Sequence, residues 1–339
     1  MRIAVDAMGG DHGPLVVVEG VKMAMKQLPR DAELLVVGKT RHLKRLFSIR
    51  RASHPRVHLV DAPQVVTMAD KPKESLKKTE SSIAIGARLV KEGQATALVT
   101  PGNTGAAMAH MMFSWRLLPG IDRPAIAGIM PNPKGVTTIL DMGANVDCKP
   151  RHLVQFAIMG ACYAQSMFGV ERPRVGILSI GEEPTKGNEL VLASRTLLER
   201  SSLNFAGNAE GRDLMTGEFD VVVCDGFVGN IVLKFAEGMA KFIMRGLKTE
   251  VSKSLVAMAG AIAMIGSARR FGRRVDASEF GAAPLLGVNG VGFIGHGGSN
   301  AKAIASAIRS ADHFGRARVN DHIRSVLGDN VNLLDSGAF

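Results

Sequence analysis

Short apolar runs recur along the chain, and each precedes a loop rich in small residues and then a helix-like pattern. Six such runs predict β-strands, at residues 3–5, 34–37, 97–99, 138–140, 175–178 and 221–224. Because the runs are nearly continuous rather than alternating, we expect the strands to be covered on both faces. The pattern predicts an α/β fold, a mainly parallel, doubly wound sheet with flanking helices.

The spacing of these elements indicates how the chain is divided. No linker rich in proline, glycine or serine, no low-complexity tract and no repeat of fixed period interrupts it. We therefore predict that residues 1–339 form a single compact α/β unit. In such sheets ligands bind beyond the carboxyl ends of the strands.

Residues 254–268 differ from the rest of the chain because they contain no charge, and Arg269, Arg270, Arg273 and Arg274 follow them. Apolar residues on every side of the helical wheel exclude a half-exposed surface helix. The stretch is short of the ~20 residues of a membrane span. Residues 248–275 are therefore a candidate protruding helical element that touches an anionic membrane. A buried core or dimer helix is the alternative.

The charge balance points to an anionic partner. The chain has 42 Lys and Arg against 31 Asp and Glu, which gives a formal net charge of +11. Nucleic acid, anionic lipid, an acidic protein and a phosphorylated ligand all fit this charge. Aromatic residues, on which single strands stack, make up 5% of the chain, which disfavours nucleic acid.

The cysteines and the N-terminal residues predict a location. The three cysteines show no C-x-x-C spacing, which argues against a disulfide framework or zinc site and for a reducing compartment. The acidic Asp6 comes too early for a signal peptide. No apolar run reaches the length of a membrane span. These features predict a soluble, cytoplasmic protein.

Four loops share a Gly-Asn pair, at residues 102–103, 187–188, 207–208 and 229–230. Glycine lets backbone N–H groups approach a ligand, and asparagine offers a side-chain amide. A loop that opens a helix also favours an anion through its free N–H groups. A plain turn with a helix cap is the alternative for each loop. Four such loops favour convergence on one anionic ligand.

Charged side chains accompany these loops. Lys186 can place a positive charge on a phosphate or on a developing oxyanion, or it is simply a solvated loop lysine. Asp6, Asp141 and Asp225 each follow a predicted strand, where carboxylates commonly order a loop or cap a helix. His12 lies in a glycine-rich loop and touches either a ligand or only its own loop.

Several common catalytic motifs are missing, namely a phosphate-binding P-loop, a G-x-S-x-G elbow and an H-E-x-x-H pair. A G-x-G-x-x-G does occur at residues 290–295. Its middle residues resemble a strand, so we do not interpret it as a dinucleotide site. Nothing in the pattern indicates a metal or a covalent nucleophile.

Together these motifs resemble the phosphate acyltransferase family of bacterial phospholipid synthesis (acyl-acyl carrier protein:phosphate transacylase), nearly from end to end. The matching segments are residues 1–12, 102–105, 120–124, 141–147, 149–150, 186–189, 225–230, 281–287 and 296–297. One departure occurs after Pro72, where Thr79 and Glu80 interrupt a basic run that is denser in the family.

The resemblance implies a fold like isocitrate and isopropylmalate dehydrogenases and phosphotransacetylase. It implies a homodimer loosely associated with the inner face of the cell membrane, with no cofactor beyond the phosphopantetheine arm of acyl carrier protein. The implied activity moves a long-chain acyl group from acyl carrier protein to inorganic phosphate, giving acyl phosphate for phospholipid synthesis. A short-chain phosphotransacetylase that uses coenzyme A, and a non-enzymatic basic module that binds membrane or RNA, are the alternatives.

These arguments lead to a set of candidate residues. We expect three catalytic residues, Lys186, Asn230 and Asp225, the last of which orders the site. We expect phosphate or the thioester to be contacted by Gly102, Asn103, Thr104, Asn188 and His12. Residues Arg269–Arg274 bind lipid or acidic acyl carrier protein, or both.

Overall fold

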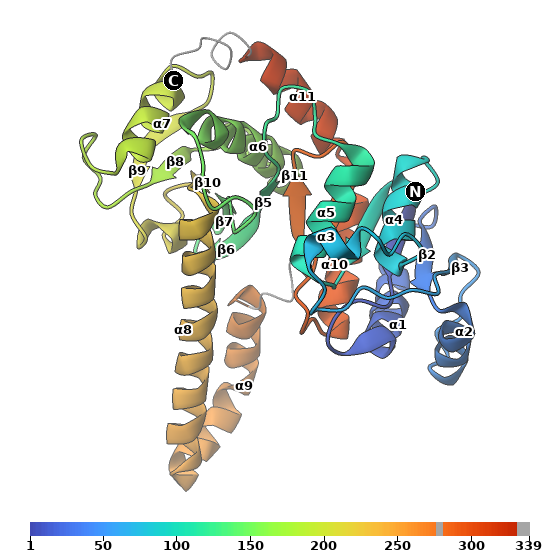
Figure 1. The fold of residues 1–339 in the computed structure, drawn as a ribbon. Helices are drawn as coiled ribbons and strands as arrows, with labels where there is room; N and C mark the ends of the chain where they lie inside the picture. The colour runs from blue at the N-terminus through green and yellow to red at the C-terminus, as the bar shows by residue number, and fades with distance from the viewer. Residues whose placement is uncertain (276–280, 331–339) are drawn as a thin grey trace.

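The computed structural model describes residues 1–275 and 281–330 (Figure 1). Its strands form two sheets. The first, in the order β3-β2-β1-β4-β12-β11-β5, consists of β1 (Arg2–Asp6), β2 (Glu33–Gly38), β3 (Val57–Asp61), β4 (Ala97–Thr100), β5 (Ala125–Ile126), β11 (Ala283–Leu286) and β12 (Val291–Ile294). The second, in the order β6-β7-β10-β8-β9, consists of β6 (Gly128–Asn132), β7 (Gly135–Leu140), β8 (Val175–Leu178), β9 (Phe205–Ala209) and β10 (Val221–Val223).

Helices follow most of the parallel strands. They are α1 (Gly13–Met25), α2 (Thr40–Ile49), α3 (Pro72–Ser75), α4 (Ser82–Lys91), α5 (Thr104–Trp115), α6 (Pro150–Phe168), α7 (Glu189–Glu199), α8 (Gly226–Ser252), α9 (Leu255–Val275), α10 (Ala301–Arg316) and α11 (Val319–Asp329), with a 3-10 turn at Asp213–Met215.

The predicted α/β class is confirmed, and all six predicted runs form strands. The strands divide between two mostly parallel sheets, and β5 and β11 pair antiparallel at one edge of the first sheet. Only Ala127 separates β5 from β6, which belongs to the second sheet. The middle of the G-x-G-x-x-G segment is strand β12, as its apolar residues indicated. The single-unit organisation stays a prediction.

The connection between the sheets brings the carboxyl ends of their strands to one region. β5 runs in the direction of β12 and β4, since β5 and β12 are both antiparallel to β11. β6 continues from β5, and β7 returns antiparallel to it. The end of β7 therefore lies beside β5, where the Met142 N–H donates to the Ile126 carbonyl at 3.0 Å. Loops from both sheets meet at this crossing.

Buried aromatic rings connect the helices of one sheet to the strands of the other. Tyr163 of α6 lies 6.1 Å from Phe314 of α10, and Phe314 lies 5.7 Å from Phe293 of β12, between ring centroids. All three side chains are at most 4% exposed. Because α6 also covers β7 and β10, the two sheets share one continuous apolar core.

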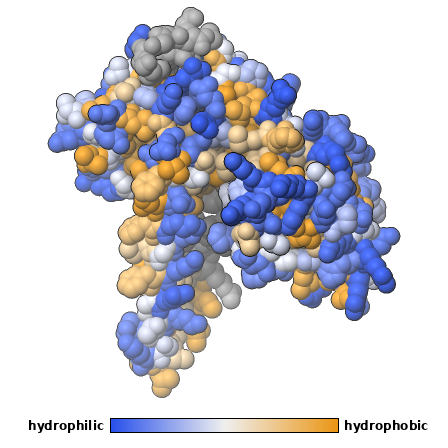
Figure 2. Space-filling view, in the orientation of Figure 1, coloured by the Kyte–Doolittle hydropathy of each residue, from blue (hydrophilic) through white to orange (hydrophobic). Residues whose placement is uncertain are grey.

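Helices α8 and α9 project away from both sheets as a hairpin (Figure 1). Large apolar side chains line it and are exposed in this chain, among them Phe242 at 72%, Leu255 at 83% and Ile262 at 70% (Figure 2). The hairpin extends to the N-terminal side of the predicted residues 248–275, because α8 begins at Gly226 and its first turn is packed against the second sheet. Among the described residues no helix is long and apolar enough to cross a bilayer.

The turn of the hairpin lies at residues 253–254, between the two helices, so nearly all of the uncharged stretch at residues 254–268 belongs to the second helix, α9. Helix α9 is exposed on nearly all sides in the single chain, and an exposed apolar surface of this kind marks a site that contacts a protein or a membrane. The predicted basic patch falls partly outside the described residues, which do not include the side chains of Arg269, Arg273 and Arg274.

Candidate active site at the facing strand ends

Three loops of the first sheet interlock beyond the ends of β1, β4 and β12. The buried Asp6 carboxylate accepts the Thr100 hydroxyl at 2.8 Å and the N–H groups of Met8 and Gly9 at 3.0 and 3.2 Å. The Thr100 hydroxyl oxygen accepts the N–H of Gly102 at 3.2 Å. Asp6 thus orders two loops by direct hydrogen bonds, which is the structural alternative considered for it.

Close backbone packing explains the glycines in these loops. A Cβ at Gly9 would lie 2.9 Å from the Gly102 backbone, and one at Gly10 would lie 3.0 Å from the Gly297 carbonyl. His12 precedes α1 and makes no side-chain cap. It lines a cavity of about 10 Å³ with Gly10 and Gly297, room for about one water molecule. His12 and Gly102 therefore lie in neighbouring loops, and their contact with phosphate or the thioester stays a prediction.

Asn103 is committed to holding its own loop. Its side-chain oxygen accepts the Ala106 N–H at 3.1 Å and caps α5. Its amide donates to the carbonyls of Met68 and Asp70 at 3.0 and 2.9 Å. The oxygen and the nitrogen of the Asn103 amide are thus both hydrogen-bonded within the protein. This agrees with the alternative of a plain turn with a helix cap. Thr104 follows as the first, exposed residue of α5.

The loop after β7 is organised around Asp141, whose side chain is 0% exposed. Its carboxylate accepts the N–H groups of Ile126, Ala144 and Asn145 at 3.0, 3.1 and 2.6 Å, and the Asn145 amide at 2.9 Å. Burial raises the pKa of this carboxyl, while the four N–H donors oppose the shift. Asp141 therefore connects β5 of the first sheet to the end of β7.

The start of α8 is pressed onto this loop. Asp225 caps the helix by accepting the Val228 N–H at 2.8 Å. A Cβ at Gly226 would lie 2.6 Å from the Asn145 carbonyl oxygen, and one at Gly229 would lie 1.9 Å from the Asp141 carbonyl oxygen. Asp225 thus fixes the N-terminus of α8 at the end of β10, which is the helix-cap alternative given for it.

Asn230 lies one residue further along α8, exposed and beside Gly143. A Cβ at Gly143 would be 3.4 Å from the Asn230 Cβ. Among the described residues, no hydrogen-bond partner is found for the Asn230 amide. Among the four Gly-Asn asparagines, Asn230 is therefore the one whose amide is not engaged within the described residues.

The loop after β8 contains Lys186, and the side chain of Asn208 holds this loop by hydrogen bonds. The Asn208 amide donates to the carbonyls of Gly181, Glu183 and Lys186 at 3.1, 2.9 and 3.2 Å. Lys186 itself is exposed, and within the described residues its ammonium makes no ion pair. Asn188 caps α7 by accepting the Val191 N–H at 2.9 Å. Lys186 is thus a charged group on a fixed loop.

The candidate residues divide between the two sheets. His12, Gly102, Asn103 and Thr104 follow strands of the first sheet, while Lys186, Asn188, Asp225 and Asn230 follow strands of the second. The two sheets meet at the β5–β6 crossing, where the Asp141 carboxylate accepts the Ile126 N–H at 3.0 Å and the Asn145 amide donates to the Pro124 carbonyl at 2.7 Å. Helices α1, α5, α7, α8 and α10 all begin at these ends, so their N-termini favour an anion there.

Comparisons with known proteins agree over nearly the whole chain. A family model described as "Fatty acid synthesis protein" matches residues 1–322. A protein of Pelobacter propionicus named phosphate acyltransferase is 49% identical, over 97% of this chain and 95% of its own length. Its namesake from Pelotomaculum thermopropionicum is 48% identical, over 96% and 94%. The chain belongs to the phosphate acyltransferase family.

Solved structures support the fold of this acyltransferase. A phosphotransacetylase from Streptococcus pyogenes matches with a TM-score of 0.61 at 15% identity, over 93% of this chain and 94% of that one. A branched-chain phosphotransacylase from Enterococcus faecalis matches with a TM-score of 0.59 at 13% identity, over 93% and 99%. The predicted phosphotransacetylase-like fold is thereby confirmed, at identities that bear on the fold alone.

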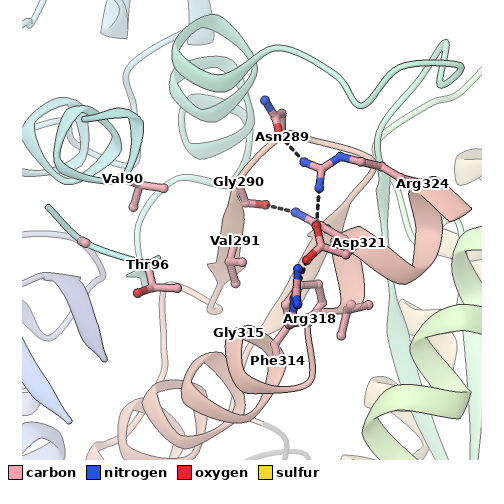
Figure 3. A pocket seen from close by; sticks show the side chains of 13 residues that line it. Val90, Thr96, Asn289, Gly290, Val291, Phe314, Gly315, Arg318, Asp321 and Arg324 are labelled. Atoms are coloured by element: carbon pink, nitrogen blue, oxygen red, sulfur yellow. Dashed lines mark hydrogen bonds and ion pairs between the residues drawn. The ribbon is translucent and has the colours of Figure 1, made fainter. Parts of the chain in front are cut away.

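A further pocket is lined by residues outside these loops (Figure 3). Its volume is about 390 Å³, and it is lined by Thr96, Gly290 and helix α11. Thr96 and Gly290 precede β4 and β12, so the pocket lies at the amino ends of the strands. Its arginines Arg318 and Arg324 are both paired with Asp321. We place the chemistry at the strand ends, where the anion-binding features converge, rather than in this pocket.

Sequence reasoning named two supporting residues, Asn208 and Asp141, but not their partners. Asn208 and Asp141 lie within recognised motifs, yet each makes hydrogen bonds to loops distant in sequence. The position after a strand was a signal for Asp141, but its burial and its partners required the structure. Cys148 and Cys162 add no nucleophile, because burial raises the pKa of each thiol to about 12.

Proposed function

We propose that this chain transfers a long-chain acyl group from acyl carrier protein to inorganic phosphate, giving an acyl phosphate for phospholipid synthesis. The observation that carries the proposal is membership of the phosphate acyltransferase family along nearly the full chain. The site supports it, since helix N-termini and loop N–H groups gather where an anion would bind.

The chemistry matches the groups available. A phosphate oxygen attacks the thioester carbonyl carbon, the C–O bond forms, and the C–S bond breaks to release a thiolate. Phosphate is already substantially dianionic near neutral pH and needs positioning more than a strong base. Lys186 and the Asn230 amide stabilise the negative charge that develops on the carbonyl oxygen. We propose that no cofactor takes part beyond the carrier's own phosphopantetheine.

One assay tests this function and the cofactor proposal together. Protein dialysed exhaustively against a chelator is mixed with long-chain acyl carrier protein and phosphate, and acyl phosphate is measured. We expect full turnover without added metal or nicotinamide, and a much lower rate with acetyl coenzyme A. A preference for acetyl coenzyme A would favour the short-chain alternative. Activity restored only by a divalent ion would contradict the cofactor proposal.

We further propose that the protein is a cytoplasmic homodimer, with the α8–α9 hairpin as its membrane contact. Exposed apolar residues along the hairpin, such as Phe242, Leu255 and Ile262, require a cover. A second subunit can cover one face, and an anionic bilayer can take the apolar residues near the tip. Apolar insertion combined with a basic patch gives reversible binding. No nucleic acid is needed to explain the net charge.

Replacing Leu255 and Ile262 together by glutamate is expected to abolish binding to anionic vesicles while sparing activity in solution. Both side chains are at least 70% exposed, so glutamate is tolerated in the folded chain but is costly in a bilayer. Vesicle flotation measures the effect. The matched control replaces Ile49 and Phe113, which are exposed outside the hairpin, and should float like wild type. Undiminished flotation of the hairpin variant, or its misfolding, would place the segment in a protein interface.

A further inference from the structure

Helix α2 and its flanks form the most one-sidedly charged segment outside the site. Residues 34–60 contain no aspartate or glutamate. Their seven cations are Lys39, Arg41, Lys44, Arg45, Arg50, Arg51 and Arg56. The inward side of α2 is held by Leu43 and Phe47, which are 0% and 4% exposed. The helix is therefore anchored by its apolar side and presents cations outward.

Most of these cations are not neutralised within the chain. Arg50 pairs with Glu19 at 3.3 Å, and Arg56 donates to backbone carbonyls. In the described part of the chain, Arg41, Lys44 and Arg45 are exposed and make no ion pair. The first turn of α2 contains no acid of its own, and its N-terminus is capped by the Asp61 carboxylate, which accepts the Thr40 N–H at 3.0 Å. Within the described residues Asp61 makes no ion pair with the exposed cations, and Arg41 and Arg45, four residues apart, repel. The charge of these side chains is thus not explained by stability.

The position of α2 relates this charge to the strand ends. The helix begins directly after β2, whose carboxyl end lies beside that of β1. A Cβ at Gly38 would lie 2.9 Å from the Met8 side chain, and the Ala7 N–H donates to the Val37 carbonyl at 2.9 Å. The end of β2, two residues before α2, therefore touches the loop after β1. From there the 10 residues of α2 extend about 15 Å.

Resting on the proposed function, we propose that the exposed face of α2, defined by Arg41, Lys44 and Arg45, is the docking surface for the acidic carrier protein. Charge complementarity would hold the carrier beside the strand ends while its flexible arm delivers the thioester to them. A membrane contact is the less suitable use. Reversible membrane binding needs apolar insertion as well as charge, and the described hairpin, not α2, presents the long apolar surface.

The test is the triple reversal Arg41→Glu, Lys44→Glu and Arg45→Glu in the full-length protein. The matched control, Lys91→Glu, Arg172→Glu and Arg200→Glu, changes net charge equally. These three exposed residues precede β4, β8 and β9, so they lie toward the amino ends of the strands, away from the carboxyl ends that carry the candidate site. We expect the α2 variant to raise KM for the acyl carrier thioester by about 10-fold or more. Turnover at saturation and the rate with a small acyl-pantetheine thioester should stay within about twofold.

Several results would overturn the assignment. One is an unchanged KM in the α2 variant, and another is an equal rise in the control. An equal loss with the small thioester would mean that α2 acts on the strand-end site instead. Reduced flotation with phosphatidylglycerol vesicles at unchanged KM would make α2 a membrane surface. A wild type that uses neither thioester would instead contradict the proposed function.

A second measurement depends neither on turnover nor on whether the triple glutamate variant folds. Fluorescence anisotropy with labelled, non-acylated carrier reports docking alone. The milder variant Arg41→Gln, Lys44→Gln and Arg45→Gln should weaken binding and reduce its salt dependence, because fewer charges attract the carrier. Equal affinity and salt dependence in this variant and wild type would count against α2.

Discussion

Turnover is expected to fall by about 100-fold or more when Lys186 or Asn230 is replaced by alanine, the scale of losing one donor that stabilises developing charge. Lys186 is an exposed cation without an ion pair, on a loop that Asn208 fixes by three hydrogen bonds. Asn230 presents an exposed amide at the start of α8. Neither side chain supports the fold, so the loss should be confined to catalysis.

Steady-state rates with saturating acyl carrier thioester and phosphate measure this effect. Thr185→Ala is the matched control, because Thr185 is exposed in the same loop but lacks a charge. Circular dichroism should be unchanged in all three variants. A near-wild-type rate in either Lys186→Ala or Asn230→Ala would remove that residue from the site.

Replacing Gly229 by alanine is expected to destabilise the protein by about 2–3 kcal/mol, the range for forcing extra atoms into a packed interior. The added Cβ would lie 1.9 Å from the Asp141 carbonyl oxygen, which is backbone and cannot swing aside. Either the start of α8 or the loop after β7 must shift. Since Asn230 is the next residue, turnover should fall as well.

Gly238 provides the opposite case on the same helix. A Cβ there meets nothing within 4 Å, so Gly238→Ala should stabilise by about 0.5–1 kcal/mol through the lower backbone entropy of the unfolded chain. Urea denaturation of both variants measures the difference. Equal midpoints for the two alanine variants would show that the contact at Gly229 relaxes without cost.

The sequence predicts the buried strands well, because a short continuous apolar run such as residues 175–178 is typical of a strand that is covered on both faces. It does not predict their division into two sheets. That division depends on β5, a strand of only two residues, and on antiparallel pairing with β11, which is distant in sequence. A strand of two residues is too short to show a periodic pattern of apolar residues, and pairing between distant strands produces no such pattern.

The sequence located the candidate loops but not the contacts of their side chains. Sequence alone could locate the Gly-Asn loops at strand ends, yet it could not distinguish an asparagine that caps a helix from one that faces a ligand. Asn103 and Asn188 are caps, Asn208 clamps a loop, and Asn230 keeps an open amide. The distinction depends on partners that are close in space, and only the fold supplies them.

The order of the strands has a consequence for synthesis of the chain on the ribosome. The second sheet uses residues 128–223 only, so all of its strands are available before the hairpin is made. In the first sheet, β4 must pair with β12, which is made almost two hundred residues later. Until then one edge of β4 is open to other strands, a recognised route to misassembly. C-terminal truncation before β12 should therefore yield aggregation rather than a smaller stable protein.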